Sequence, residues 1–117
     1  MTDRRADTLI QDAIDAAGRL ARFVDGRTVD DYFADEFLRS AVERQCEIFG
    51  EALSVLRRTA PELAGRIEGI SPAIGFRNIL AHGYFSIDDG VAWDIASTKI
   101  PPLVQQLPAL LERLGGR

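Results

Sequence analysis

The sequence predicts an all-α protein, built as an antiparallel up-and-down bundle of four to five helices. Apolar residues recur at steps of three and four over two long segments, residues 7–24 and 35–58, and this spacing is typical of one helix face. No run alternates apolar and polar residues long enough to predict a sheet. The connections are short, so neighbouring long helices should pack antiparallel. A length of 117 residues fits one domain, residues 1–117, with a single core.

The first predicted helix covers residues 7–24 and is followed by a short helical turn. Ile10, Ile14 and Leu20 belong to its apolar stripe. Gly26 closes the helix, because glycine readily supplies the left-handed conformation that follows a helix end. Thr28 is expected to cap a short helical turn that runs through Tyr32.

The second long helix, residues 35–58, has an unusually broad apolar face. Such a face is typical of a helix that is central in a bundle or paired with another subunit, and we expect both. Gly50 lies inside this helix. A glycine there costs about 1 kcal/mol relative to alanine, and it commonly marks the close approach of a neighbouring backbone.

Capping residues and prolines delimit the helices expected in the second half of the chain. They predict a short helix over 61–66 and a third main helix that runs from Ser71-Pro72 to His82 and stops at Gly83. A short segment that contains Trp93 should follow, with Asp88 as its cap. The last helix should run from Pro101-Pro102 to Gly115-Gly116.

Composition limits the functions that the chain could have. It is 46% hydrophobic, which argues against disorder, and it lacks an apolar run as long as a membrane-spanning helix. A polar N-terminus and one cysteine, Cys46, lead us to expect a reduced, cytoplasmic protein without a secretory signal. The net charge of −4 lacks the basic footprint of most nucleic-acid-binding proteins. Binding of RNA would therefore depend on a local group of arginines.

The chain's one histidine, His82, follows Arg77 by five residues and precedes Tyr84 by two. On a helix, Asn78 and His82 share a face, and Arg77 lies about 140° round from His82 and about 7.5 Å along the axis. Arginine, asparagine and histidine could therefore converge on one anion-sized site. The alternative is structural, because a histidine in the last turn of a helix often serves the helix dipole. Tyr84, likewise, could simply be a packed aromatic residue.

These residue types suit the cleavage of RNA. Histidine titrates near neutral pH and can exchange a proton with the 2′-hydroxyl or with the leaving 5′-oxygen. Arginine can hold the phosphate and stabilise the charge that builds on it. Neither a metal nor a cofactor is needed when the substrate supplies its own nucleophile. One histidine supplies one of the two proton transfers, so a two-fold dimer with the site at its interface is expected.

Several motifs resemble the HepT-like ribonucleases of the HEPN superfamily. Arg77-x-x-x-x-His82-x-Tyr84 matches the family's R-x-x-x-x-H-x-Y signature. The resemblance extends over nearly the whole chain, in order: residues 76–85 look like the family's MRNxLxHGYF segment, 91–94 like its xxWD helix, 100–103 like its LPPL helix start, and 41–44 with 48–52 like its AVxRxxExIGEA helix.

The resemblance implies a HEPN-like homodimer that acts as a toxin and cuts RNA without metal. Arg77 and His82 would be the catalytic pair, and Asn78 and Tyr84 would position the substrate. The implied partner is an antitoxin, a nucleotidyltransferase of the MNT type. In part of the family this partner transfers AMP to the motif tyrosine, which makes Tyr84 the candidate acceptor. An alternative is a non-catalytic subunit that binds a nucleotide or a protein partner within a nucleotidyltransferase complex.

Other residues give weaker signals. Gln45 follows Arg44 where the family commonly has asparagine, a departure that could alter the shape of the cleft. Cys46 is expected to be an inert packed thiol, and Trp93 a core or interface residue. The acidic pairs Asp30-Asp31 and Asp88-Asp89 are interpreted as helix caps rather than metal ligands.

Overall fold

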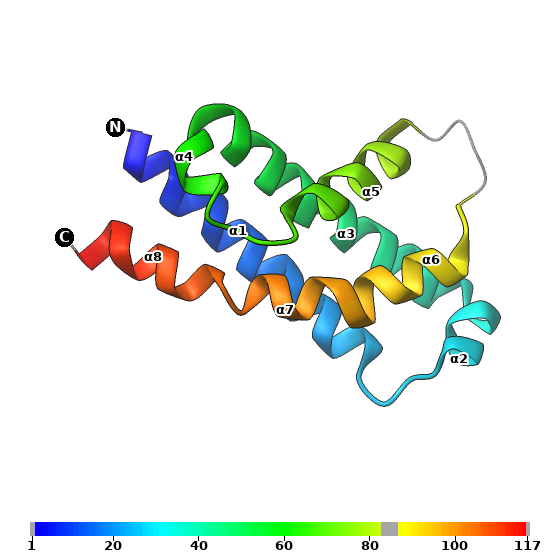
Figure 1. Ribbon diagram of the computed structural model, residues 1–117. Helices are drawn as coiled ribbons and strands as arrows, with labels where there is room; N and C mark the ends of the chain where they lie inside the picture. Colours follow the sequence, from blue (N-terminus) through cyan, green and yellow to red (C-terminus); the bar gives the residue numbers. More distant parts are fainter. Residues whose placement is uncertain (1, 83–86, 117) are drawn as a thin grey trace.

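The computed structural model describes residues 2–82 and 87–116, and this part of the chain is helical with short connections. In Figure 1, α1, α3, α5 and a final rod made of α6 to α8 alternate in direction. The predicted all-α, up-and-down arrangement is therefore confirmed. The elements are α1 (Thr2–Val24), α2 (Val29–Ala34), α3 (Glu36–Thr59), α4 (Pro61–Ala64), α5 (Ile70–His82), α6 (Asp89–Asp94), the π-helical turn η1 (Ile95–Lys99), α7 (Ile100–Val104) and α8 (Leu107–Gly116).

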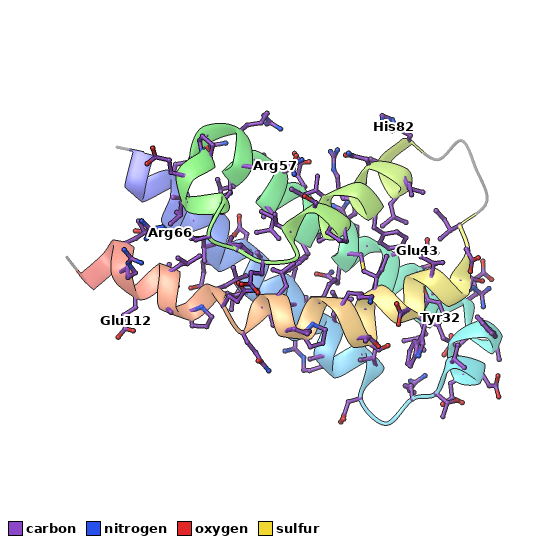
Figure 2. The ribbon with its side chains drawn as sticks, viewed as in Figure 1. Tyr32, Glu43, Arg57, Arg66, His82 and Glu112 are labelled. Atoms are coloured by element: carbon purple, nitrogen blue, oxygen red, sulfur yellow. The ribbon has the colours of Figure 1, made fainter. Side chains whose placement is uncertain are left out.

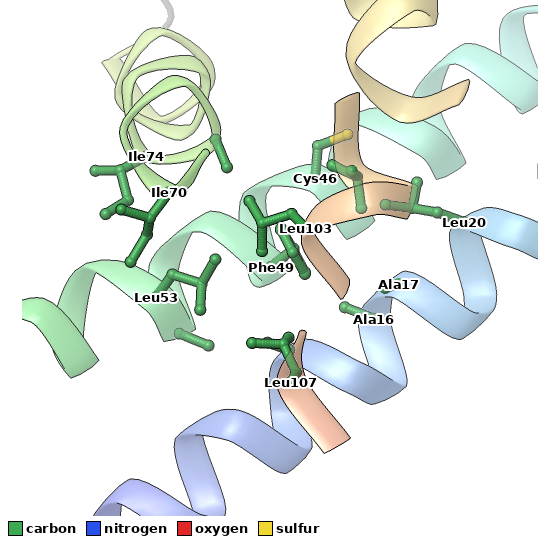
Figure 3. Packing of buried hydrophobic residues seen from close by; sticks show 14 of the residues in the cluster. Ala16, Ala17, Leu20, Cys46, Phe49, Leu53, Ile70, Ile74, Leu103 and Leu107 are labelled. Carbon is green, nitrogen blue, oxygen red and sulfur yellow. The ribbon is translucent and has the colours of Figure 1, made fainter. Parts of the chain in front are cut away.

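Helix α3 is central, because α1 and α5 both pack along it and α2 and α4 contact its ends. Its broad apolar face is buried between these neighbours, and Val42, Phe49 and Leu53 are fully inaccessible to solvent. On α1, Ala13 and Ala16 are also fully buried. Figure 3 shows the side chains of α1, α3, α5 and the last rod meeting in one core.

The first half of the chain follows the sequence prediction closely, except that α1 begins at Thr2 rather than at residue 7. Gly26 adopts a left-handed φ of 72° after α1 ends. Thr28 caps α2 in a capping box: its side chain accepts from Asp31 N–H, and the Asp31 carboxylate accepts from Thr28 N–H. The capping predictions for Gly26 and Thr28 are confirmed.

Two predicted boundaries in the second half were wrong. Helix α5 starts at Ile70 rather than at Ser71, and the Ser71 hydroxyl accepts from Arg57 on α3, 3.5 Å away, instead of capping the helix. The predicted last helix was also wrong in its extent: Pro101-Pro102 lies at the start of α7, as predicted, but the helical path enters α7 from α6 and η1 and then breaks before α8. The break falls at residues 105–106, before Pro108, whose ring would clash with the carbonyl of Val104 in an uninterrupted helix.

The break is fixed by hydrogen bonds from Gln106 to the loop before α5. The Gln106 side-chain amide donates to Glu68 O and accepts from Glu68 N–H, each at 2.9 Å. The two bonds join the last rod to the start of α5.

No described helix has the length and the apolar composition that crossing a bilayer requires.

A group of titratable side chains is buried where α2, α3 and α6 meet. Tyr32 is fully buried, and its ring lies 5.4 Å from that of Trp93, which is partly buried and packs against the core. Burial raises the pKa of the Tyr32 phenol, with the charges of Glu43 and Asp89 adding to the effect. Burial also raises the pKa of the Cys46 thiol to about 12, with a further contribution from Glu43. Cys46 is therefore a protonated, packed thiol, as predicted.

We predict that Tyr32→Phe leaves the fold unchanged and raises the free energy of unfolding by about 1 kcal/mol. The Tyr32 hydroxyl is buried without a hydrogen-bond partner in the described part of the chain, and an unsatisfied buried polar group costs about 1–3 kcal/mol. Urea denaturation of the two proteins measures the difference. A clear loss of stability in Tyr32→Phe would show that the hydroxyl has a partner.

A second prediction concerns Glu43, a half-buried residue of α3 that Figure 2 labels near Tyr32. Burial and the charge of Asp89 raise the pKa of its carboxyl, and Arg39 opposes this only in part. A carboxyl whose pKa is higher in the folded chain gives stability at low pH that is lost as the pH rises through that pKa.

Glu43→Gln should therefore be more stable than the wild type at neutral pH. This advantage should shrink as the pH falls to about 4, near the ordinary pKa of a glutamate carboxyl. Melting temperatures of both proteins across this pH range provide the measurement. An advantage that is independent of pH would mean that ionisation of Glu43 is not the cause.

Candidate active site

Arg77, Asn78 and His82 lie along the second half of α5, which is much less covered than the first half. Ile70, Ala73, Ile74 and Phe76 are buried against α3 and the last rod, whereas Asn78 and His82 are exposed and Ile79 is 51% exposed. The buried half fixes the helix on the core. The other half carries its polar side chains into solvent, where a substrate can reach them.

Arg77 lies at the boundary between these halves, where α5 crosses α3 at Gly50. A Cβ atom at Gly50 would collide with Arg77 Cβ, and it would lie 2.9 Å from Ala73 O and 3.0 Å from Arg77 Cγ. A side chain at position 50 would therefore push the two helices apart. The close approach predicted from Gly50 is confirmed, and the backbone that approaches is that of the helix bearing Arg77.

The Arg77 guanidinium is held by two oxygen atoms. Its Nη2 lies 2.5 Å from Glu51 Oε1 on α3, and its Nη1 donates to Asn78 Oδ1 over 3.0 Å. The Arg77 side chain is 26% exposed and that of Glu51 is 46% exposed. The guanidinium is thus oriented by its neighbours, while part of the Arg77 side chain remains exposed to solvent. Its Nε is buried without a partner among the described side chains.

His82 is the last residue of α5 and is exposed. In Figure 2 its side chain lies at the tip of the helix and points away from the helical body. Five residues separate it from Arg77, about 7.5 Å along a helix axis. The structure thus brings Arg77 and Asn78 into contact and leaves His82 accessible on the same uncovered half of α5. Gly83 and Tyr84 lie outside the described residues.

A pocket of about 260 Å³ adjoins Arg77 on the surface formed by α1 and α3. Its floor is apolar, with Leu9 from α1 and Ile48 from α3, and its charged rim includes Arg44, Glu47 and Glu51. Arg44 Nη1 lies 3.2 Å from Glu47 Oε1. The segment 41–52 and the segment around Arg77, which are distant in sequence, therefore border one concave surface.

Gln45 does not line this pocket. Its side-chain oxygen instead accepts from Arg19 Nη1 on α1 over 3.3 Å. The departure from asparagine at this position therefore affects the contact between α1 and α3, because the longer glutamine side chain reaches Arg19.

The acidic pairs have the capping role that was predicted. Asp31 completes the capping box of α2, and the Asp88 side chain accepts from Val91 N–H at the start of α6. Asp89 lies 3.7 Å from Arg39 Nε. In the described ranges, no group of three histidine, cysteine or acidic residues is arranged to hold a metal ion.

Glu51 is the residue of this site to which the sequence analysis assigned no role. A carboxylate one residue after a glycine that marks a helix crossing was the available signal. The sequence alone could not identify Arg77 as the partner of Glu51, because this contact depends on which turn of α5 packs against Gly50.

Gly50→Ala should destabilise the protein by about 1–3 kcal/mol, because it overpacks the crossing between α3 and α5. Gly75→Ala is the matched control on α5, where a Cβ would meet nothing within 4 Å. That change should stabilise the helix by about 0.5–1 kcal/mol through helix propensity. Denaturant unfolding of both variants tests the pair. Equal effects would mean that the two helices do not approach as described.

Comparison with known proteins places the chain in a family. The model of the ribonuclease HepT-like family matches residues 13–110. A Methanocaldococcus jannaschii protein, named as a gamma-glutamylcyclotransferase and candidate RNase, is 33% identical over 81% of this chain, which spans only 42% of that protein. Another candidate RNase of that organism is 26% identical over 92% of this chain and 97% of its own length.

A candidate RNase of Caldanaerobacter subterraneus is 30% identical over 77% of this chain and 80% of its own length. No solved structure matches the chain significantly. The family model covers well over half of the sequence, and it includes the helix that bears Arg77 and His82. The chain therefore belongs to the HepT-like ribonuclease family.

Proposed function

We propose that this protein is a cytoplasmic toxin that cuts RNA as a metal-independent endonuclease, with Arg77 and His82 as its catalytic residues. One observation supports this most directly: in a member of a ribonuclease family, an oriented arginine and an exposed histidine occupy the uncovered half of one helix. A phosphodiester could reach both side chains from solvent.

The reaction follows from the chemistry of these groups. His82 takes the proton of the 2′-hydroxyl, and the 2′-oxygen attacks phosphorus while the bond from phosphorus to the 5′-oxygen breaks. Arg77 binds the phosphate and stabilises the charge that develops on its oxygens. The 5′-oxygen leaves with a proton from a second acid. The products are a 2′,3′-cyclic phosphate and a 5′-hydroxyl.

The second acid would be the histidine of a second copy of the chain in a homodimer. This arrangement is supported by the exposed end of α5, where Ile79 is 51% exposed beside Asn78 and His82. An apolar side chain next to polar site residues suits the edge of a subunit interface. Two-fold symmetry would bring two copies of the Arg77 and His82 pair to one groove.

The partner that we propose is a nucleotidyltransferase of the MNT type, acting as the antitoxin. It would transfer AMP from ATP to the hydroxyl of Tyr84, two residues beyond His82, with release of pyrophosphate. A phosphate group placed there would compete for Arg77 and repel RNA. Asn78 already contacts Arg77, so it would position the guanidinium in addition to the substrate.

A second candidate function is that of a non-catalytic subunit within a nucleotidyltransferase complex. Two observations favour it: the chain has a net charge of −4, and Glu51 already neutralises Arg77. Such a subunit would bind the transferase stably and would cut no RNA.

The decisive experiment compares wild-type protein, His82→Ala and Arg77→Ala on single-stranded RNA with EDTA present. Loss of a general acid–base group should lower the rate about 10²–10⁴-fold, and loss of the arginine about 10²–10³-fold. Arg58→Ala serves as the control, because Arg58 is exposed on α3 away from the pocket.

Circular dichroism checks that each variant folds. Cleavage that survives His82→Ala would contradict the proposed mechanism. Cleavage that EDTA abolishes would contradict metal independence. A pure wild-type protein that cuts no RNA would favour the binding subunit instead.

A further inference from the structure

Glu51 is joined to the proposed catalytic arginine through an ion pair between two helices. It lies on α3, whereas Arg77 lies on α5, and the pair joins Glu51 Oε1 to Arg77 Nη2 at 2.5 Å. The other terminal nitrogen, Nη1, donates to Asn78 Oδ1 at 3.0 Å. A guanidinium is planar, so contacts at both terminal nitrogens fix the plane as well as the position of the group.

The base of the same side chain is fixed by the residue next to Glu51. Gly50 leaves no space between α3 and Arg77 Cβ and Cγ. Arg77 is therefore constrained at its base by Gly50 and at its end by Glu51. The two constraints come from consecutive residues of α3, so the position of the guanidinium depends on α3 as much as on α5.

Two N–H groups of the guanidinium are used in these contacts. A guanidinium has five N–H donors, and one more remains on each terminal nitrogen. These donors and the partial exposure of the Arg77 side chain, 26%, leave the guanidinium able to donate hydrogen bonds to a phosphate. Glu51 can hold Arg77 in this way without contacting the RNA itself.

We propose that Glu51 is the positioning residue of the cleavage site: it acts through Arg77 and holds the guanidinium in the orientation that binds the scissile phosphate. This inference rests on the proposed ribonuclease function. Glu47 is a natural comparison, because it lies one turn earlier on α3 and borders the same pocket, but it pairs with Arg44 rather than with Arg77.

The test measures kcat and KM for RNA cleavage by wild-type protein, Glu51→Gln and the control Glu112→Gln, whose side chain is exposed on α8 and does not line the pocket. Glu51→Gln keeps the size of the side chain and removes its charge. We expect kcat to fall about 10–100-fold, the range found when outer groups that orient a reactive centre are lost, with a smaller change in KM. Glu112→Gln should stay within about twofold of the wild type, as expected away from the reacting atoms.

A double-mutant cycle with Arg77→Ala shows whether Glu51 acts through Arg77. Adding Glu51→Gln to Arg77→Ala should produce no further loss, because the residue that it positions is gone. A further loss of the same size as in the wild-type background would overturn the inference. So would a Glu51→Gln variant that cuts RNA as fast as the wild type.

A second measurement does not depend on cleavage. In NMR spectra, slow rotation about the Arg77 Nε–Cζ bond gives separate signals for its two NH₂ groups. This rotation should become fast in Glu51→Gln. It should stay slow in Glu47→Gln, where the pair between Glu51 and Arg77 is intact. Rotation that is equally slow in Glu51→Gln would overturn the positioning role. A wild type that cuts no RNA would contradict the proposed function, and the NMR result would still decide whether Glu51 fixes Arg77.

Discussion

The contact on which the site depends is the crossing of α3 and α5 at Gly50. With no side chain at this position, the backbone of α3 lies directly against Arg77, and the next residue, Glu51, reaches the guanidinium. The buried first half of α5 keeps this crossing in place through Ala73 and Phe76. Core packing and the geometry of the arginine are therefore one structural feature, because the same few residues determine both.

The crossing also accounts for how an acidic protein can present an arginine to an anion. The chain has a net charge of −4, so its overall field would repel a polyanion. At short range, however, an oriented guanidinium forms directional hydrogen bonds that a diffuse charge cannot supply. Arg44 and Arg77 each have a carboxylate neighbour. Such pairing restrains their orientation and weakens unspecific attraction to distant phosphates.

Sequence patterns predicted the helices well where local signals decide the structure. Gly26 and Thr28 act at the ends of helices through their own backbone or side chain, so their roles could be read from the neighbouring residues. Pro101 does mark the start of α7, but the prediction ran the last helix on to Gly116 and missed the break before α8, which Pro108 marks. The partnership of Glu51 with Arg77 joins residues 26 positions apart. It depends on the angle and register at which two helices pack, which no local pattern contains.

The uneven burial of α5 has a consequence for how the protein responds to heat. Residues after Arg77 have few buried apolar contacts, whereas those before it belong to the core. Segments of this kind open locally at a lower free-energy cost than global unfolding. The last turn of α5, with His82, would therefore fray at temperatures at which α1 and α3 remain packed. Warming would separate His82 from Arg77 well before the bundle itself melts, so any function that needs both side chains should be lost before helicity.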